Sequence, residues 1–335
     1  MGLMGLAGLP DSTLGIGAAL SAAFCWAIAT RLFSRLGGIL SPAGLNCLKG
    51  AIAITLFLLT LLGRSLATGE PWFALTGAEM GFLALSGVLG IGVGDTAYFE
   101  SLNRLGPRLS LLLESAAPIV TATLAWIFLQ EALSVTALLG MVIAVGGITW
   151  TLAEQTAPTA LPAPNPSQSH PQAKPQIKSQ TKLQGILWGI VAALSQAGGS
   201  VIARGTLAAS TVDPQQSGLV RLVAGSMMAL AIATVTHLFK SPSSAPEDAS
   251  PPNRLRLPFH LSLRLLLATF LGTYLGISLQ QTALKLTFAG IAQTCLATSP
   301  LFILPILWLG GERLSYRAIA GALVTVGGIV ILVQG

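Results

Sequence analysis

Two carboxyl groups interrupt long apolar stretches of the sequence. Asp95 lies deep in one stretch, and Glu114 lies in the next, one helical turn before Pro118. A charge in an apolar environment needs a partner, a cavity or a functional role, because leaving water costs free energy. Such a carboxyl group can bind an ammonium group or exchange a proton, because burial disfavours its charged form. Tyr98 follows Asp95 at i+3, so it shares the same helix face.

Both carboxyl groups also have a structural interpretation. Asp95 can accept hydrogen bonds from hydroxyl groups on a neighbouring helix, and Glu114 can pair with a basic residue such as Arg31 or Lys49. The sequence leaves these alternatives open.

Neutral polar side chains interrupt apolar stretches in the second half of the chain. Tyr274, Ser278 and Gln281 follow one another at i, i+4 and i+7, on one stripe of a helix. Gln293 lies in the following stretch. Trp26, in the first stretch of the chain, could form the bottom of a cavity. Groups of this kind either line a cavity or join neighbouring helices, and the sequence leaves both interpretations open.

The residues needed for common enzyme sites are missing from the apolar stretches. The histidines His170, His237 and His260 lie outside the centres of these stretches, so a histidine-based metal or nucleophile site is not expected. The sequence has no Gly-x-Ser-x-Gly elbow and no phosphate-binding loop. We therefore expect no enzyme activity, no cofactor and no metal.

The composition indicates a membrane protein. Apolar residues make up 53% of the 335 residues and charged residues only 9%, whereas soluble domains carry about 25% charged residues. The mean hydropathy is +0.75. The net charge of +6 is dispersed, without the basic cluster that nucleic acid binding requires. The expected partners are the lipid bilayer and a small-molecule substrate, with protons as a candidate coupling ion and no nucleic acid.

Ten stretches are long and apolar enough to span a membrane as helices. They cover residues 13–33, 42–62, 79–102, 107–129 and 134–152, and then residues 183–207, 215–239, 261–284, 288–309 and 315–333. Residues 154–182 between the two sets are rich in Pro, Gln and Ser. Such a segment cannot bury enough apolar surface to order itself, so it is predicted to be a disordered linker.

The two sets of five spans repeat one pattern. The matching residues are Gly90, Gly94, Pro118, Trp126, Glu131 and Gly146-Gly147 in the first half, and Gly272, Gly276, Pro300, Trp308, Glu312 and Gly327-Gly328 in the second. Five is odd, so the second copy would enter the membrane from the opposite side. The predicted fold is an all-α membrane protein with ten transmembrane helices in two inverted-topology repeats, with a site near the midplane between them.

The repeated prolines and glycines predict local features of the spans. Pro118, Pro300 and Pro305 are expected to break the regular helix, because proline lacks an N–H group and clashes with the preceding turn. The Gly-x-x-x-Gly pairs and both double glycines are expected to let helices approach closely.

The region GDTAYFESLNRLGPRLSLLLESAAPIVTATLAWIFLQEALS resembles the third to fifth spans of the EamA domain, within the drug/metabolite transporter (DMT) superfamily. The loop glycine of the family is Gly106, and its proline and helix-ending glutamate are Pro118 and Glu131. The resemblance predicts EamA-like repeats at residues 13–153 and 183–334, joined by the linker 154–182. It implies secondary transport of small metabolites, often amino acids, without a cofactor.

The sequence thus predicts a secondary transporter that exports small polar or amphipathic metabolites by alternating access between the repeats. Asp95, Tyr98, Glu114, Tyr274, Gln281, Gln293 and Trp26 are the candidate cavity or coupling residues. An uncoupled facilitator or channel of the same fold, and a structural or lipid-binding membrane subunit, are the alternatives. The expected location is the plasma (inner) membrane. The distribution of Lys and Arg does not fix the orientation of the termini.

Overall fold

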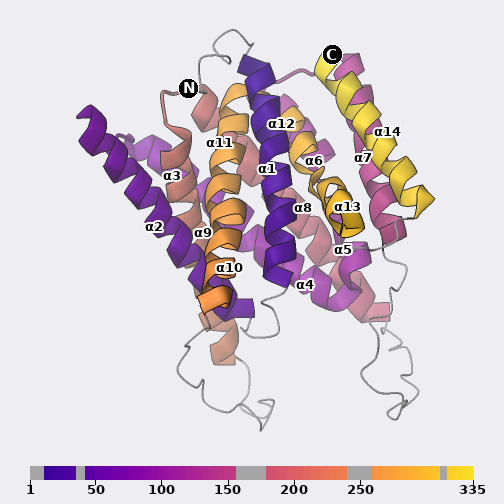
Figure 1. The fold of residues 1–335 in the computed structure, drawn as a ribbon, viewed down its shortest axis with the longest axis horizontal. Helices are drawn as coiled ribbons and strands as arrows, with labels where there is room; N and C mark the ends of the chain where they lie inside the picture. The colour runs from indigo at the N-terminus through magenta and orange to yellow at the C-terminus, as the bar shows by residue number, and fades with distance from the viewer. Residues whose placement is uncertain (1–10, 35–41, 156–178, 240–258, 310–314) are drawn as a thin grey trace.

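The computed structural model describes residues 11–34, 42–155, 179–239, 259–309 and 315–335 (Figure 1). This described part is helical and contains no β-strand. Nine of its helical segments are long and apolar enough to cross a membrane, judged by length and composition. The expectation of an all-α membrane protein is confirmed.

The first half begins with two long helices, continues through a series of short segments and ends with a long helix. The elements are α1 (Asp11–Ser34), α2 (Pro42–Thr68), α3 (Gly77–Gly87), η1 (Val88–Gly94), α4 (Asp95–Leu105), α5 (Pro107–Glu114), α6 (Ala117–Leu129) and α7 (Val135–Gln155). Gly106, between α4 and α5, has φ of +78°, a conformation that favours glycine.

The second half has the same order of long and short elements. They are α8 (Ser179–Ala208), α9 (Pro214–Phe239), α10 (Phe259–Thr269), η3 (Phe270–Leu275), α11 (Gly276–Leu286), α12 (Ala289–Leu296), α13 (Ser299–Leu309) and α14 (Tyr316–Gln334). Helices α7 and α8 extend into both ends of the predicted linker, because adding polar residues to an existing helix costs little. Residues 156–178 of that linker lie outside the described residues.

The third and eighth predicted spans each contain a π-helical segment at the same place in the repeat. Segment η1 joins α3 to α4, and η3 joins α10 to α11. Segment η1 contains both Gly90 and Gly94, whereas η3 contains Gly272 and ends directly before Gly276. A π-helix widens the helical turn and is frequent at functional sites. The sequence does not indicate these π-helical segments, because its glycines predict close packing but not a change in hydrogen-bond pattern.

The predicted breaks at Pro118 and Pro300 are present. Helix α5 ends at Glu114 and α6 starts at Ala117, and in the second half α12 and α13 are separated by residues 297–298. Both prolines come directly after the break, in the first turn of the new helix, where a missing N–H group is tolerated. The predicted break at Pro305 was wrong, because Pro305 lies inside the continuous helix α13.

Each half of the chain packs its first two helices against the other half. Helix α1 contacts α10, η3, α11, α12 and α13, whereas α8 contacts α3, η1, α4, α5 and α6. In the same way α2 contacts α10 and η3, and α9 contacts α3 and η1. Figure 1 shows α1 in the middle of the bundle, beside α11 and α12. The two halves therefore exchange their first helices.

Helices α7 and α14 form a separate pair at one side of the bundle (Figure 1). Their backbones meet at Gly140 and Gly147 of α7 and at Gly321 and Gly328 of α14, where an added Cβ would clash with the partner helix. By contrast, an added Cβ at Gly146 or Gly327 would meet no atom within 4 Å. Only one glycine of each repeated pair therefore makes the close contact.

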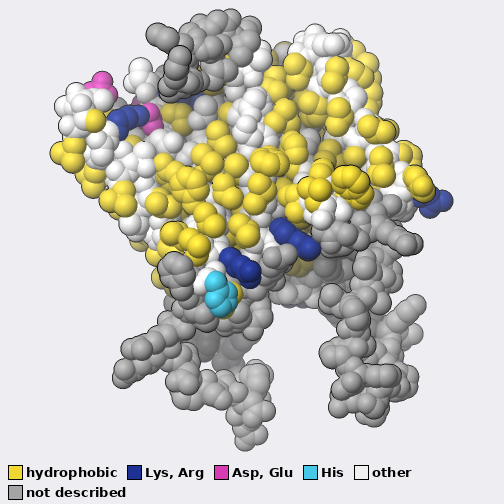
Figure 2. Space-filling model, viewed as in Figure 1, with side chains coloured by type: hydrophobic (Ala, Val, Ile, Leu, Met, Phe, Trp, Pro, Cys, Tyr) yellow, Lys and Arg dark blue, Asp and Glu magenta, His cyan; other side chains and the backbone are white. Residues whose placement is uncertain are grey.

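The surface suits a hydrocarbon environment. Figure 2 shows a broad band of hydrophobic side chains across the visible face, with Lys, Arg and His side chains along its lower border. Large apolar side chains such as Phe128 (71% exposed) and Leu323 (68% exposed) project from the protein. Such continuous exposure of apolar surface is typical of contact with a membrane.

Candidate functional site

Asp95, Tyr98 and Glu114 line one small cavity. Its volume is about 110 Å³, and its other lining residues are Gly90, Gly94, Ala192 and Gln196. Helices α4 and α5 of the first half contribute the carboxyl and phenol groups, and η1 contributes Gly90 and Gly94. Helix α8 of the second half contributes Ala192 and Gln196, so the cavity lies where the two halves meet.

Both carboxyl groups lie next to an interruption of the regular α-helix. Asp95 is the first residue of α4, directly after η1, and Glu114 is the last residue of α5, directly before the break at Pro118. A Cβ at Gly94 would lie 3.6 Å from the Ser195 side chain and 3.7 Å from the backbone nitrogen of Gln196. These are ordinary contact distances, so α8 packs next to Asp95, and its closest approach to η1 is at Gly199, where an added Cβ would lie 2.9 Å from the Gly90 backbone.

The acidic groups of this cavity interact electrostatically with one another. The charge of Asp95 acts on Glu114, and both act on Tyr98, while Lys49 of α2 acts on Asp95. Glu114 and Tyr98 are partly buried, and Asp95 is exposed. Neither carboxyl group makes a hydrogen bond or ion pair within the described part of the chain. The alternative pairing of Glu114 with Arg31 or Lys49 is thus not seen there.

The other predicted site residues lie at contacts between helices. The Trp26 indole donates a hydrogen bond of 2.8 Å to the carbonyl oxygen of Gly272, which joins α1 to η3. Tyr274 shares a hydrogen bond of 2.7 Å with Thr60 of α2 and packs edge-on against Phe57, with ring centroids 4.9 Å apart.

Ser278 and Gln281 point towards α9. Ser278 donates to the side chain of Gln215 at 2.9 Å, and Gln281 accepts from Ser217 at 2.9 Å. Gln293 of α12 is 7% exposed, and its Oε1 atom has no hydrogen-bond partner among the described residues. The structure does not bring Trp26, Tyr274, Gln281 or Gln293 into the cavity with Asp95, and their part in binding stays a prediction.

Arg221 of α9 is a functional candidate that the sequence analysis missed. It is the largest fully buried side chain of the described residues, with 2% exposure. Its Nη1 atom donates to Gln281 Oε1 at 3.2 Å. An arginine inside the predicted span 215–239 was the available signal, because an ionisable residue within a span is a functional hypothesis by default.

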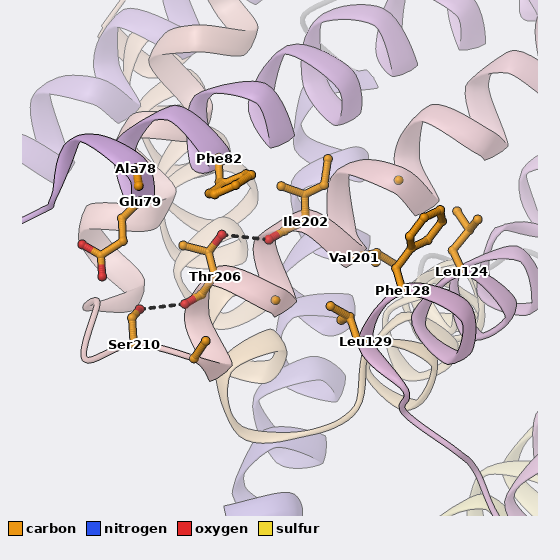
Figure 3. Close-up of a pocket in the computed structure, with 13 residues that line it drawn as sticks. Ala78, Glu79, Phe82, Leu124, Phe128, Leu129, Val201, Ile202, Thr206 and Ser210 are labelled. Atoms are coloured by element: carbon orange, nitrogen blue, oxygen red, sulfur yellow. Dashed lines mark hydrogen bonds between the residues drawn. The ribbon is translucent and has the colours of Figure 1, made fainter.

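A larger hollow of about 650 Å³ lies between α3, α6 and α8 and is lined mainly by apolar side chains (Figure 3). Its polar groups already have partners within the protein. Glu79 accepts from the N–H and hydroxyl of Thr76, Thr206 donates to the Ile202 carbonyl, and Ser210 donates to the Thr206 carbonyl. The hollow thus offers little to a polar solute, and the small cavity is the better candidate site.

A comparison with known protein families assigns the chain to a family. Residues 13–153 and 183–334 each match the EamA-like transporter family. The chain belongs to the EamA-like transporter family. Its two matching regions cover both halves of the bundle, so the EamA-like transporter is a multi-pass membrane protein built from two EamA repeats.

Other comparisons bear on the fold alone. A comparison with curated protein sequences gave no match. A solved structure described as "Crystal structure of protein" is similar to this EamA-like transporter with a TM-score of 0.66, over 96% of each chain, at 16% sequence identity. EamA proteins are transporters and not, in general, enzymes. Nothing in the comparisons identifies the solute.

Proposed function

We propose that this EamA-like transporter is a secondary carrier that exports small polar or amphipathic metabolites, such as amino acids, by alternating access. One observation carries the proposal: Asp95, Tyr98 and Glu114 of the first half share a cavity with Gln196 of the second half. Movement of one half relative to the other would change the access to this cavity, as expected for a carrier with inverted repeats.

The proposed architecture is ten transmembrane helices in two inverted repeats, residues 13–153 and 183–334, joined by the linker 154–182. Helix α9 would supply the tenth span, because it occupies the place in the second half that α2 occupies in the first. The reciprocal packing of α1 and α8 supports a two-fold relation between the halves. Figure 1 places the start of α1 and the end of α14 at the same end of the bundle, as an even number of crossings requires.

The carboxyl groups are proposed to couple transport to protons in the plasma membrane. They lack ion-pair partners in the described part of the chain and face a common cavity. Two acidic groups that repel each other are suited to exchange a proton for solute, because protonation of one relieves the repulsion.

The first test uses Asp95→Asn and Glu114→Gln in vesicles loaded with a pH-sensitive dye and exposed in turn to the common amino acids. We expect at least one variant to lose solute-dependent proton movement by at least about tenfold, which corresponds to about 1.4 kcal/mol of lost interaction. Glu100→Gln is the matched control, because Glu100 forms an exposed ion pair with Arg104 in the same helix. Full pH-driven transport by both variants would exclude proton coupling through these groups.

The alternative functions give different results in the same vesicles. A facilitator or channel would equilibrate the solute without accumulating it, even when a pH gradient is imposed. A structural or lipid-binding subunit would show no flux at all when purified alone. Accumulation of a solute against its gradient by the purified protein excludes both alternatives.

A further inference from the structure

Arg221 lies among elements of both halves of the chain. Its own helix, α9, packs directly on the first half, because a Cβ at Gly87 would clash with the backbone of Arg221. Its Nη1 atom donates to Gln281 Oε1 of α11 at 3.2 Å, and Ser217, one turn earlier on α9, donates to the same oxygen at 2.9 Å. The guanidinium is thereby held at a fixed position in the interior.

This buried position holds more hydrogen-bond donors than acceptors. Only Nη1 of the three Arg221 side-chain nitrogens makes a hydrogen bond within the described residues, and Nε is fully buried without a partner. The Nε2 amide group of Gln281, which is 0% exposed, is also buried without a partner. Unpaired buried donors are costly and uncommon in folded proteins. Their concentration around one guanidinium indicates that an acceptor-rich group is to be bound there.

The positive charge of Arg221 has no anionic partner among the described residues. No carboxylate of the described part of the chain forms an ion pair with it. Arg204, whose side chain is 12% exposed, differs in this respect, because its Nε atom donates to Glu131 at 2.6 Å. A buried charge is normally paired or bound to a ligand.

The guanidinium also borders the small cavity described above. A Cβ at Gly90 would lie 3.4 Å from Arg221 Nη2 and 3.2 Å from Gln196 Oε1. Gly90 and Gln196 both line the cavity. The guanidinium therefore lies close to two of the residues that line the cavity.

We infer that Arg221, together with the Gln281 amide, forms an oxyanion-binding site at the edge of the cavity and recognises a carboxylate or phosphoryl group of the solute. The planar guanidinium suits such a group, because its forked donors match two oxygen atoms at once. The statement that the bound group belongs to a transported solute rests on the proposed function. The existence of the anion-binding site does not depend on that function.

The test measures thermal unfolding of the full-length protein in detergent, with sodium acetate or sodium phosphate added and sodium chloride used to keep the ionic strength constant. We expect Tm to rise with one or both oxyanions and then to saturate, by about 2 °C or more at ten times the dissociation constant. A response to acetate alone assigns a carboxylate ligand, and a response to phosphate alone assigns a phosphoryl ligand.

Two variants locate the effect. Arg221→Gln removes the charge, and Gln281→Glu places a carboxylate where Gln281 Oε1 already contacts Arg221. Both are expected to lose the anion-dependent rise in Tm, and Gln281→Glu is expected to have a higher Tm than wild type without added anion. If Arg221→Gln fails to fold, Gln281→Glu still tests whether the anions bind at Arg221. Arg104→Gln is the control for a general salt effect, because Arg104 is an exposed partner of Glu100.

Two results would overturn the inference: a wild-type Tm that responds to neither oxyanion beyond chloride, or an equal response in Gln281→Glu. The assay requires no transport, so the two proposals can fail separately. Anion binding without flux in vesicles would reject the carrier function and keep the site. Flux without anion-dependent stabilisation would reject the site and keep the carrier.

Discussion

Gly147→Val is expected to lower the free energy of unfolding by about 3 kcal/mol or more, the upper range for forcing extra atoms into a packed core. A Cβ at Gly147 would lie 2.6 Å from the backbone nitrogen of Thr325 and 2.7 Å from the carbonyl oxygen of Gly321. These are backbone atoms of α14, which cannot move aside as a flexible side chain can. The valine must therefore push α7 and α14 apart where their backbones meet.

Gly146→Val is the matched control, because it places the same side chain one residue earlier in the same helix. A Cβ there would meet no atom within 4 Å. Its cost is expected to stay within about 0.5 kcal/mol, as for other surface substitutions. The Tm of both variants is measured by thermal unfolding in the same detergent. Equal Tm values would show that α7 and α14 do not pack through Gly147.

The second large effect is expected at Glu131. This carboxylate is 9% exposed, accepts from Arg204 Nε at 2.6 Å and accepts from the backbone N–H of Ala289 at 2.8 Å. Arg204 Nη1 in turn donates to the carbonyl oxygens of Leu284 and Lys285, at 2.9 and 2.7 Å. The cluster joins the segment after α6 to α8, to the last turn of α11 and to the start of α12, so it ties the two halves together.

Glu131→Gln is expected to cost about 3–5 kcal/mol, because it leaves the buried charge of Arg204 unpaired. Glu100→Gln changes the same chemical group in an exposed pair with Arg104, at 41% and 31% exposure, and is expected to cost at most about 1 kcal/mol. The measurement is the fraction of protein that remains monodisperse after heating. Similar losses for both variants would contradict the structural role of Glu131.

The repeat was the part of the fold that the sequence predicted best. Proline, glycine and glutamate at matching positions report on backbone constraints, and these constraints recur in both halves. The breaks at Pro118 and Pro300 follow from the missing N–H group. Pro305 shows the limit of this reasoning, since α13 continues through it. Whether a proline ends a helix depends on the surroundings of the residue, which the sequence does not show.

The candidate site was predicted only in part. Asp95, Tyr98 and Glu114 stand out because acidic and phenolic groups are costly in apolar spans, and the structure places them in one cavity. The π-helical segment η1, which directly precedes Asp95, depends on hydrogen-bond geometry, which no residue type specifies. Glu131 looks like an ordinary helix-end charge in the sequence, and only the packing of α8 against α6 and the turn before α12 shows that it is buried.

The most direct test of the carrier proposal is the accessibility of the cavity from each side of the membrane. Ala192 lines the cavity and is 1% exposed, so Ala192→Cys adds a small reporter. The background replaces Cys25, Cys47 and Cys295 by alanine, and Ala203→Cys, at a buried position of the same helix outside the cavity, is the control. A membrane-impermeant thiol reagent is applied to one side at a time. Alternating access predicts labelling of Ala192→Cys from both sides and of Ala203→Cys from neither, whereas labelling of Ala192→Cys from one side only, or from neither, would contradict it.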